Sequence, residues 1–232
     1  MPRQIRNKIG LISGMKRELR CLGLRRPAHL LTFAAAGSPE RARARADGWI
    51  AGERVAGLVS FGICGGLDPA LVPGSIIVAH EIVLPEGGSW CFDDAWARSV
   101  AARIPGARIA PILGVATAAI TAEEKSALFA RHGAPAVDME SRGVAEAAYE
   151  AKLPFVALRA VADPASRSLP AAALAGINAQ GRMRPWRVLL ALLARPGDFP
   201  ALVALAGEAR RGYAALAAAA KNGALARELL PR

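Results

Sequence analysis

Short apolar runs alternate along the chain with segments whose apolar residues recur at helical spacing. Each apolar run is short enough for one strand, and turn residues separate the runs. The predicted strands are Lys8–Gly14, His29–Ala36, Val55–Phe61, Ser75–Val83, Arg108–Val115, a short strand ending in Asp138-Met139-Glu140, and Phe155–Val161. The predicted helices are Glu18–Leu22, Pro39–Ala51, Asp93–Ala102, Thr121–Arg131, which opens on a capping box, and one that starts at Ser141.

This alternation is typical of an α/β fold, with a central mixed, mostly parallel sheet and helices on both faces. No linker or internal repeat divides the chain, so residues 1–232 are expected to form a single domain. Residues 168–232 form a variable, helical C-terminal part in this interpretation.

The composition fits a globular protein from a reducing compartment. Hydrophobic residues make up 53% of the chain and charged residues 21%. The 3 cysteines show no CxxC spacing, which argues against a disulfide framework or a zinc site. The basic N-terminus lacks the apolar core of a secretory signal, and no segment is long enough for a membrane span. We therefore expect a cytoplasmic protein with no bound metal.

Two acids stand at the ends of strongly apolar strands, Glu140 before a helix and Asp163 after the last strand. In open parallel sheets ligands bind in the crevice outside such strand ends, where partial burial makes acid/base chemistry possible. Two plain structural interpretations remain open. Glu140 could be a helix-start acid favoured by the helix dipole, and Asp163, which precedes Pro164, could be a turn residue.

A glycine-rich stretch, residues 62–66, follows the third predicted strand. Glycines allow close approach of the backbone to a ligand, or they form a tight turn. The sequence GICGGL does not match the dinucleotide fingerprint GxGxxG, and no Lys-Ser/Thr follows as in a P-loop.

Five pieces in order resemble the purine nucleoside phosphorylase and nucleosidase family, above all the methylthioadenosine/adenosylhomocysteine nucleosidases. The resemblance covers roughly residues 8–165. Its pieces are GMKRE, SFGICGGLDP, the Pro73-Gly74-Ser75 approach to a strand, VDMES and the strand ending ADP. It implies a nucleoside phosphorylase-like fold, no cofactor, and a homo-oligomer that shares the mouth of the pocket across a subunit interface.

The resemblance also implies roles for individual residues. Met139 and Glu140 would contact the ribose, and Asp163 would act as general acid towards the purine N7. Glu18 would activate the attacking water, although in the charged run KRELR it could also be a plain surface residue. Ile63 and Gly65 would line the substrate site.

Two departures from the family pattern bear on the nucleophile. Phosphorylases of the family carry an Arg before the glycine stretch and a Ser or Thr within it, where this chain has Ser60 and Ile63. An apolar Ile63 side chain cannot donate a hydrogen bond to phosphate, which together with Glu18 favours water. A separate departure is at Ala162, which stands where nucleosidases of the family carry a Ser before the general acid, here Asp163.

The net charge of +11 comes from 30 basic against 19 acidic residues. We find neither a nucleic-acid-binding module nor a basic patch with interleaved aromatics, so no nucleic-acid partner is expected. Residues 181–232 are apolar and arginine-rich, with candidate helical stripes at Trp186, Leu189, Leu190 and Leu193 and at Phe199, Leu202, Val203 and Leu205. They could pack in the core or an oligomer, admit a lipid-like group, or contact an anionic membrane.

This C-terminal part resembles the hopanoid-associated branch of the family. The expected function is cleavage of the N-glycosidic bond of a 5′-substituted adenosine with an apolar 5′ group, adenosylhopane in hopanoid biosynthesis, to release adenine. Two alternatives stay open, a phosphate-dependent phosphorylase that yields a ribose-1-phosphate product and a non-catalytic binding protein of hopanoid assembly.

Overall fold

A computed structural model describes residues 8–23, 27–53, 55–170, 173 and 194–226. All of the described strands belong to one ten-stranded mixed sheet, in which parallel pairings outnumber antiparallel ones. The strand order is β6-β5-β8-β9-β3-β10-β4-β7, and β1 and β2 extend the sheet from β3. The predicted mixed α/β fold is confirmed.

Most elements lie where the sequence pattern predicts them. The strands are β1 (Lys8–Ser13), β2 (Leu30–Ala34), β3 (Val55–Gly66), β4 (Ile76–Ala79), β5 (Glu81–Val83), β6 (Ser89–Cys91), β7 (Arg108–Ile109), β8 (Ile112–Gly114), β9 (Ala136–Asp138) and β10 (Phe155–Asp163). The helices are α1 (Lys16–Arg20), α2 (Pro39–Gly52), α3 (Ala95–Ala101), α4 (Ala122–His132), α5 (Ser141–Glu150), the short 3₁₀ helix η1 (Pro196–Asp198) and α8 (Phe199–Lys221).

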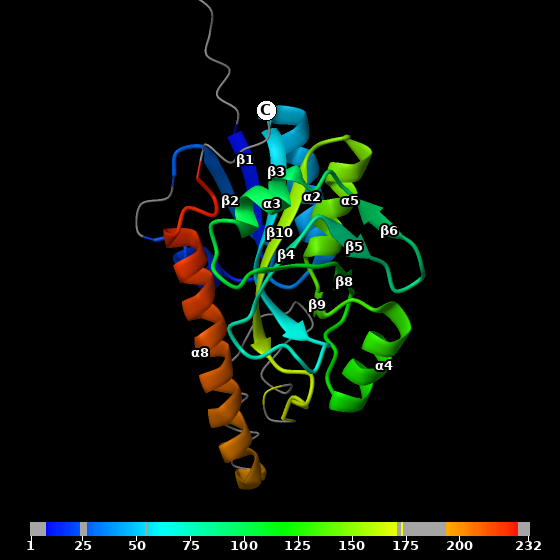
Figure 1. Cartoon of the computed structure of the whole chain (residues 1–232), viewed down its shortest axis with the longest axis vertical. Helices are drawn as coiled ribbons and strands as arrows, with labels where there is room; N and C mark the ends of the chain where they lie inside the picture. The colour runs from blue at the N-terminus through cyan, green and yellow to red at the C-terminus, as the bar shows by residue number, and fades with distance from the viewer. Residues whose placement is uncertain (1–7, 24–26, 54, 171–172, 174–193, 227–232) are drawn as a thin grey trace, which may run out of the picture.

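Helices cover both faces of the sheet (Figure 1). On one face α2 and α5 bury small residues such as Ala42, Ala46 and Ala148 against the strands. On the other face α3 and α8 contribute Trp96 and Leu216 to a second apolar cluster. Because their buried alanine side chains are small, α2 and α5 lie close to the sheet and hold the strand ends in fixed positions.

Local sequence determines where helices begin and end. The Ser38 side chain accepts a hydrogen bond from the backbone of Arg41 and caps α2, whose first residue is Pro39. The predicted capping residue Thr121 does the same for α4, where its Oγ1 accepts from the Glu124 amide at 3.1 Å. Gly133, with φ of 68°, ends α4 in the left-handed conformation that glycine tolerates best.

Several predicted boundaries are wrong. The glycine stretch 62–66 is not a loop but the second half of β3, because it pairs with both β9 and β10. The predicted strand Ser75–Val83 is two strands that part at His80, and Arg108–Val115 divides at residues 110–111. The strand β6 was not predicted at all. Such breaks depend on which neighbour each half pairs with, which the apolar pattern does not specify.

The long C-terminal helix α8 packs along one side of the sheet and extends beyond its lower edge in Figure 1. Leu216 and Ala219 are buried against the sheet, whereas Phe199 and Val203 near the start of the helix are exposed. The first predicted apolar stripe, Trp186 to Leu193, lies outside the described residues. No helix among the described residues is both long and apolar enough to cross a membrane.

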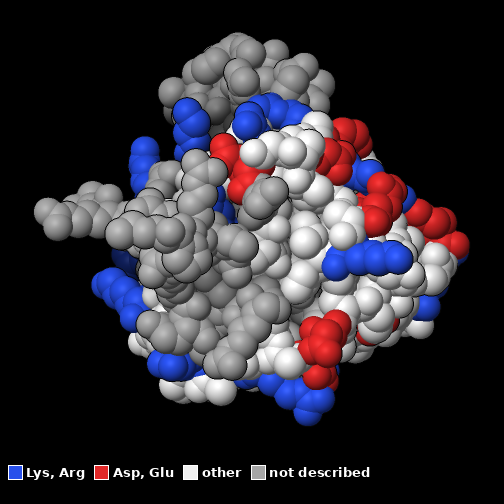
Figure 2. All heavy atoms as spheres, turned by 90° about the horizontal axis from the view of Figure 1, so that it is seen from above, with Lys and Arg blue, Asp and Glu red and all other residues white. Residues whose placement is uncertain are grey.

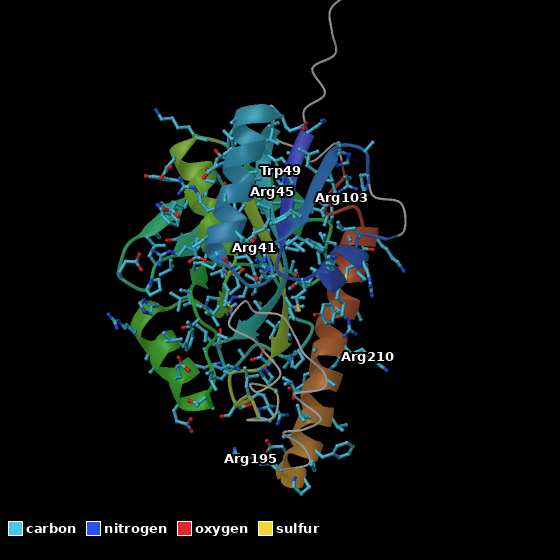
Figure 3. The ribbon with its side chains drawn as sticks, turned by 180° about the vertical axis from the view of Figure 1, so that it is seen from behind. Arg41, Arg45, Trp49, Arg103, Arg195 and Arg210 are labelled. Carbon is cyan, nitrogen blue, oxygen red and sulfur yellow. The ribbon has the colours of Figure 1, made fainter. Side chains whose placement is uncertain are left out.

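Basic side chains of the described residues occur in several parts of the molecule. On the face that Figure 2 shows, they lie along the left edge and are mixed with acidic groups on the right. Figure 3 shows Arg41 and Arg45 on α2, Arg210 part-way along α8, and Arg195 at the lower end of the molecule. Arg45 stacks over the Phe33 ring at 4.5 Å, so part of this charge packs against aromatic surface.

Candidate active site

Three strands meet at Gly65. It pairs with Val137 of β9 on one side and with Asp163 of β10 on the other. The strand ends open into a cavity of about 820 Å³. Every site residue predicted from the sequence lines this one cavity: Glu18, Ile63, Gly65, Met139, Glu140 and Asp163. The common crevice is thus present, although β9 runs antiparallel to β3 rather than parallel as expected.

A fully buried guanidinium, Arg159 of β10, lies at the centre of a cluster of carboxyl groups. Its Nη2 is 2.5 Å from Asp138 Oδ2 and 3.5 Å from Glu140 Oε2. The same nitrogen donates to Ser60 Oγ at 2.6 Å. Ser141 Oγ donates to Asp138 at 2.5 Å, which completes the polar layer under the cavity. We call Asp138, Glu140, Glu18 and Arg159 the carboxyl cluster.

One cation cannot neutralise three buried acids. Burial raises the pKa of Glu140 to about 8, and although Arg159 opposes this rise, Asp138 and Glu18 add to it. Burial likewise raises the pKa of Asp138 and of Glu18, with Arg159 again opposing the rise. At neutral pH the Glu140 carboxyl therefore holds its proton in the free protein, and the cluster gains from any positive charge placed next to it.

Glu18 is buried at the start of α1, not exposed as its charged sequence context would allow. Its Oε2 accepts from the Met15 amide at 2.6 Å, and its Oε1 accepts from the Ile63 amide at 2.9 Å. The carboxyl thereby joins α1 to β3 at the cavity wall. The amide of Ile63 is consequently engaged by the protein itself.

Glycines near the cluster make room for side chains. A Cβ on Gly62 would lie 2.3 Å from Arg159 Nη1 and 2.5 Å from Glu18 Oε1. A Cβ on Gly14 would lie 2.3 Å from Glu140 Oε1. The lack of a side chain at Gly14 and Gly62 therefore leaves space for the side chains of the carboxyl cluster, and these glycines do not serve to form a turn.

Asp163 lines the same cavity but is not part of the carboxyl cluster. Its Oδ2 accepts a hydrogen bond from Lys125 Nζ of α4. Burial raises the pKa of Asp163, and the Lys125 charge opposes that rise. The adjoining wall, residues 115–120 with Leu169, is mostly apolar and suits a flat heterocycle.

Acids dominate the charged groups of the cavity lining. Among the described residues, Arg41 is its one basic side chain. The acidic ones are Glu18, Glu40, Asp138, Glu140 and Asp163. No group of three or more metal-ligating side chains occurs in the described part of the chain. The lining therefore favours a neutral or cationic ligand over an anion.

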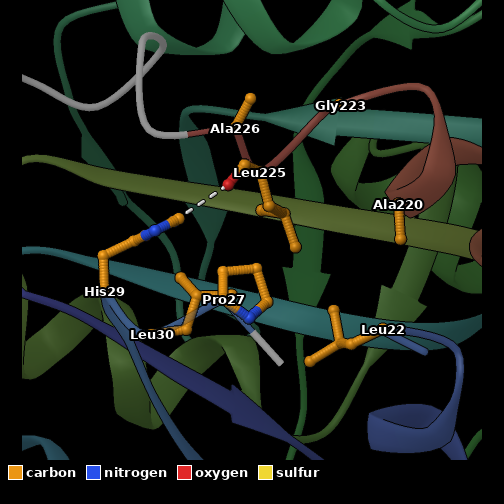
Figure 4. Close-up of a pocket in the computed structure, with 8 residues that line it drawn as sticks. All are labelled: Leu22, Pro27, His29, Leu30, Ala220, Gly223, Leu225 and Ala226. Atoms are coloured by element: carbon orange, nitrogen blue, oxygen red, sulfur yellow. Dashed lines mark hydrogen bonds between the residues drawn. The ribbon is translucent and has the colours of Figure 1, made fainter. Parts of the chain in front are cut away.

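A second, smaller cavity of about 220 Å³ lies between the start of β2 and the end of α8 (Figure 4). Its described wall is apolar, and the one titratable side chain among the described lining residues, His29, is 3.1 Å from the Leu225 carbonyl oxygen. The described lining offers no second polar side chain to a ligand, so we do not place the active site there.

Four residues of these polar contacts were not predicted from the sequence, namely Asp138, Ser141, Arg159 and Lys125. A signal for Arg159 was available, since a charged residue in the middle of the otherwise apolar run FVALRAVA implies a buried partner. Lys125 gave none, because a Lys in the run EEK is typical of an exposed helix face.

Comparison with known proteins bears on the fold. Residues 113–194 match the family model described as the Phosphorylase superfamily. The solved 5′-methylthioadenosine/S-adenosylhomocysteine nucleosidase of Colwellia psychrerythraea, in complex with adenine, aligns with a TM-score of 0.61 at 20% identity, over 69% of this chain and 84% of that one. The fold is nucleoside phosphorylase-like.

Two structures from Helicobacter pylori agree with that assignment of the fold. A nucleosidase mutant with 5′-methylthioadenosine in its active site aligns with a TM-score of 0.62 at 16% identity, over 69% of this chain and 87% of that one. Futalosine hydrolase aligns with a TM-score of 0.61 at 16% identity, over 69% and 86%. No curated protein sequence matches the chain.

Proposed function

We propose that this protein is a nucleosidase that cleaves the N-glycosidic bond of a 5′-substituted adenosine and releases adenine. The observation that carries the proposal is the convergence of Glu18, Glu140 and Asp163 on one cavity, from three elements far apart in the sequence. The match to the Phosphorylase superfamily model and the similarity in fold to solved nucleosidases support it.

In the proposed mechanism Asp163 donates a proton to N7 of the adenine. The C1′–N9 bond then breaks with its electron pair moving to N9, so the base leaves as neutral adenine. The ribose left behind has oxocarbenium character. Glu140 contacts its hydroxyl groups, and the acidic cluster stabilises the positive charge that develops at C1′. Glu18 accepts a proton from the attacking water molecule while the water oxygen forms a bond to C1′.

The acidic lining supports water over phosphate as the nucleophile. A phosphate would enter a cavity with five acids and one Arg among its described lining residues. Charge-assisted donors are what an anion needs, and the Ile63 amide, which could have served, already donates to Glu18. The departures at Ser60 and Ile63 from the phosphorylase pattern agree with this electrostatic argument.

The 5′ group in this proposal is large and apolar, and adenosylhopane is the candidate substrate. Met15, beside Glu18 on the cavity wall, is 38% exposed, so an apolar side chain is accessible at this wall. Each CH₂ that a substrate buries there contributes about 0.8 kcal/mol to binding. A homo-oligomer that shares the pocket mouth is part of the same proposal.

The proposal is tested by measuring adenine release from adenosylhopane and from methylthioadenosine, with and without phosphate. We expect release without phosphate. Asp163→Asn and Glu18→Gln should lower it by about 10²–10⁴-fold. Glu150→Gln, on an exposed side chain of α5, serves as the matched control and should leave the rate unchanged.

Two results would point elsewhere. Release only with phosphate, with a ribose-1-phosphate product, would identify a phosphorylase. Binding of the nucleoside with no release in either buffer would identify a binding protein of hopanoid assembly.

A further inference from the structure

Lys125 is buried in a position that is unfavourable for a cation. Its side chain has no exposed surface, although it belongs to the first turn of α4. The first turn of a helix carries partial positive charge, and burying an ammonium group without partners is costly. Specific contacts must therefore compensate for both effects.

Three acceptors satisfy the three donors of the ammonium group. Lys125 Nζ donates to Asp163 Oδ2, to the Pro164 carbonyl oxygen at 3.0 Å and to the Arg167 carbonyl oxygen at 2.9 Å. Lys125 does not line the cavity. It therefore contacts Asp163 from behind and holds the backbone that follows β10.

The rest of that backbone is held to the same helix. The Ala122 amide donates to Ser168 Oγ at 3.0 Å, and the Leu169 amide donates to the Ile120 carbonyl oxygen at 2.8 Å. Residues 115–120, which form the apolar wall beside Asp163, are thereby tied to the segment after Asp163. Lys125 lies where the acid, the wall and the segment meet.

We propose that Lys125 is the positioning residue of Asp163, holding its Oδ2 from behind the cavity so that Oδ1 is left to the purine. The proposal deepens the proposed function and rests on it for the identity of the base. Within the described residues, no side chain or backbone group bonds Oδ1.

The pair also limits how tightly Asp163 holds its proton. The charged groups facing Asp163 are Lys125 on α4, Arg167 after β10, and Glu208 on α8, which itself pairs with Arg167 at 2.6 Å. Burial raises the pKa of Asp163, Lys125 and Arg167 lower it, and Glu208 raises it. Removing Lys125 leaves burial less opposed, so the pKa must move further upward.

The test compares Lys125→Met, which removes the charge at similar length, with Lys125→Gln and with the exposed control Lys221→Met. The carboxyl pKa of Asp163 is measured in the free protein by ¹³C NMR and assigned with Asp163→Asn. The expected result for both Lys125 variants is a rise of about one to three pH units. If circular dichroism shows that Lys125→Met does not fold, the titration is carried out with Lys125→Gln alone.

The kinetic readout is the pH profile of kcat/KM for adenine release. With Lys125 replaced, the basic limb should move to higher pH, and the rate at pH 7 should fall by about 10–100-fold. An unchanged Asp163 pKa in the variants, or an equal loss of rate at every pH, would overturn the proposal. Absence of release by the wild type would instead refute the proposed function, while the NMR titration still decides the role of Lys125.

Discussion

At the scale of residues, the proposed chemistry depends on a shortage of positive charge beside the buried acids. Arg159 faces Asp138 and Glu140 directly, and its charge also acts on Glu18. Each acid therefore holds its proton more tightly than it would in water. Such a cluster is suited to a positive transition state because that charge supplies the missing counter-ion.

Glu140 should make the stability of the protein depend on pH. Its pKa rises from an ordinary value of 4.5 to about 8 on folding. The native state therefore binds this proton more tightly than the unfolded state does, so stability is full below the lower value and is lost as pH rises through the higher one. Relative to Glu140→Gln, the wild type should lose free energy of unfolding, on the order of a few kcal/mol, between about pH 5 and pH 9.

Urea unfolding of both proteins at several pH values measures this difference. Glu150→Gln, on an exposed side chain, should keep a constant difference from the wild type over the same range. A constant difference for Glu140→Gln as well would show that Glu140 is ionised throughout.

At the scale of elements, the packing of α5 on α2 places the acids. Gly143 of α5 lies so close to α2 that an added Cβ would be 2.0 Å from the Pro39 carbonyl oxygen. Glu140 stands immediately before α5, and Pro39 lines the edge of the cavity. A change in this helix contact therefore reaches the site.

Gly143→Ala should destabilise the protein by about 1–3 kcal/mol, because the two helices must move apart. Gly48→Ala in α2 is the matched control. No heavy atom would approach its Cβ within 4 Å, and removing a helical glycine should stabilise by about 0.5–1 kcal/mol. Urea unfolding measures both changes, and equal effects at the two positions would contradict the close contact.

At the scale of the whole molecule, the described part of the chain is close to charge balance, with 20 basic and 18 acidic side chains, whereas the described cavity lining holds five acids and one Arg. Most of the net charge of +11 belongs to residues outside the described part of the chain. The start of α8 combines exposed Phe199 and Val203 with Arg195 close by in sequence. This combination keeps open the predicted contact with an anionic membrane.

Sedimentation with lipid vesicles tests that contact. We expect the full chain to bind vesicles rich in anionic lipid at about 50 mM salt and to be released at about 500 mM, because salt screens surface charge. Neutral vesicles are the control and should retain little protein. Equal binding to both kinds of vesicle would mean that apolar contacts alone are responsible, and no binding would refute the prediction.

The sequence by itself determined the α/β class and most elements, because apolar periodicity reports burial. It also singled out Glu140 and Asp163, because these acids stand at the ends of apolar strands. The other four predicted residues that line the cavity, Glu18, Ile63, Gly65 and Met139, came from the resemblance of the ordered motifs GMKRE, GICGG, VDMES and ADP to a known family.

Tertiary structure alone decided which charged side chains lie close enough to form ion pairs. Arg159 and Lys125 acquire their roles from partners on other elements, and sequence spacing does not encode a contact between α4 and the end of β10. It also decided that the glycines of β3 belong to a strand, because Gly62 leaves room for Arg159 and Glu18. Burial and pairing, which set the proton affinity of each carboxyl, exist only once the chain is folded.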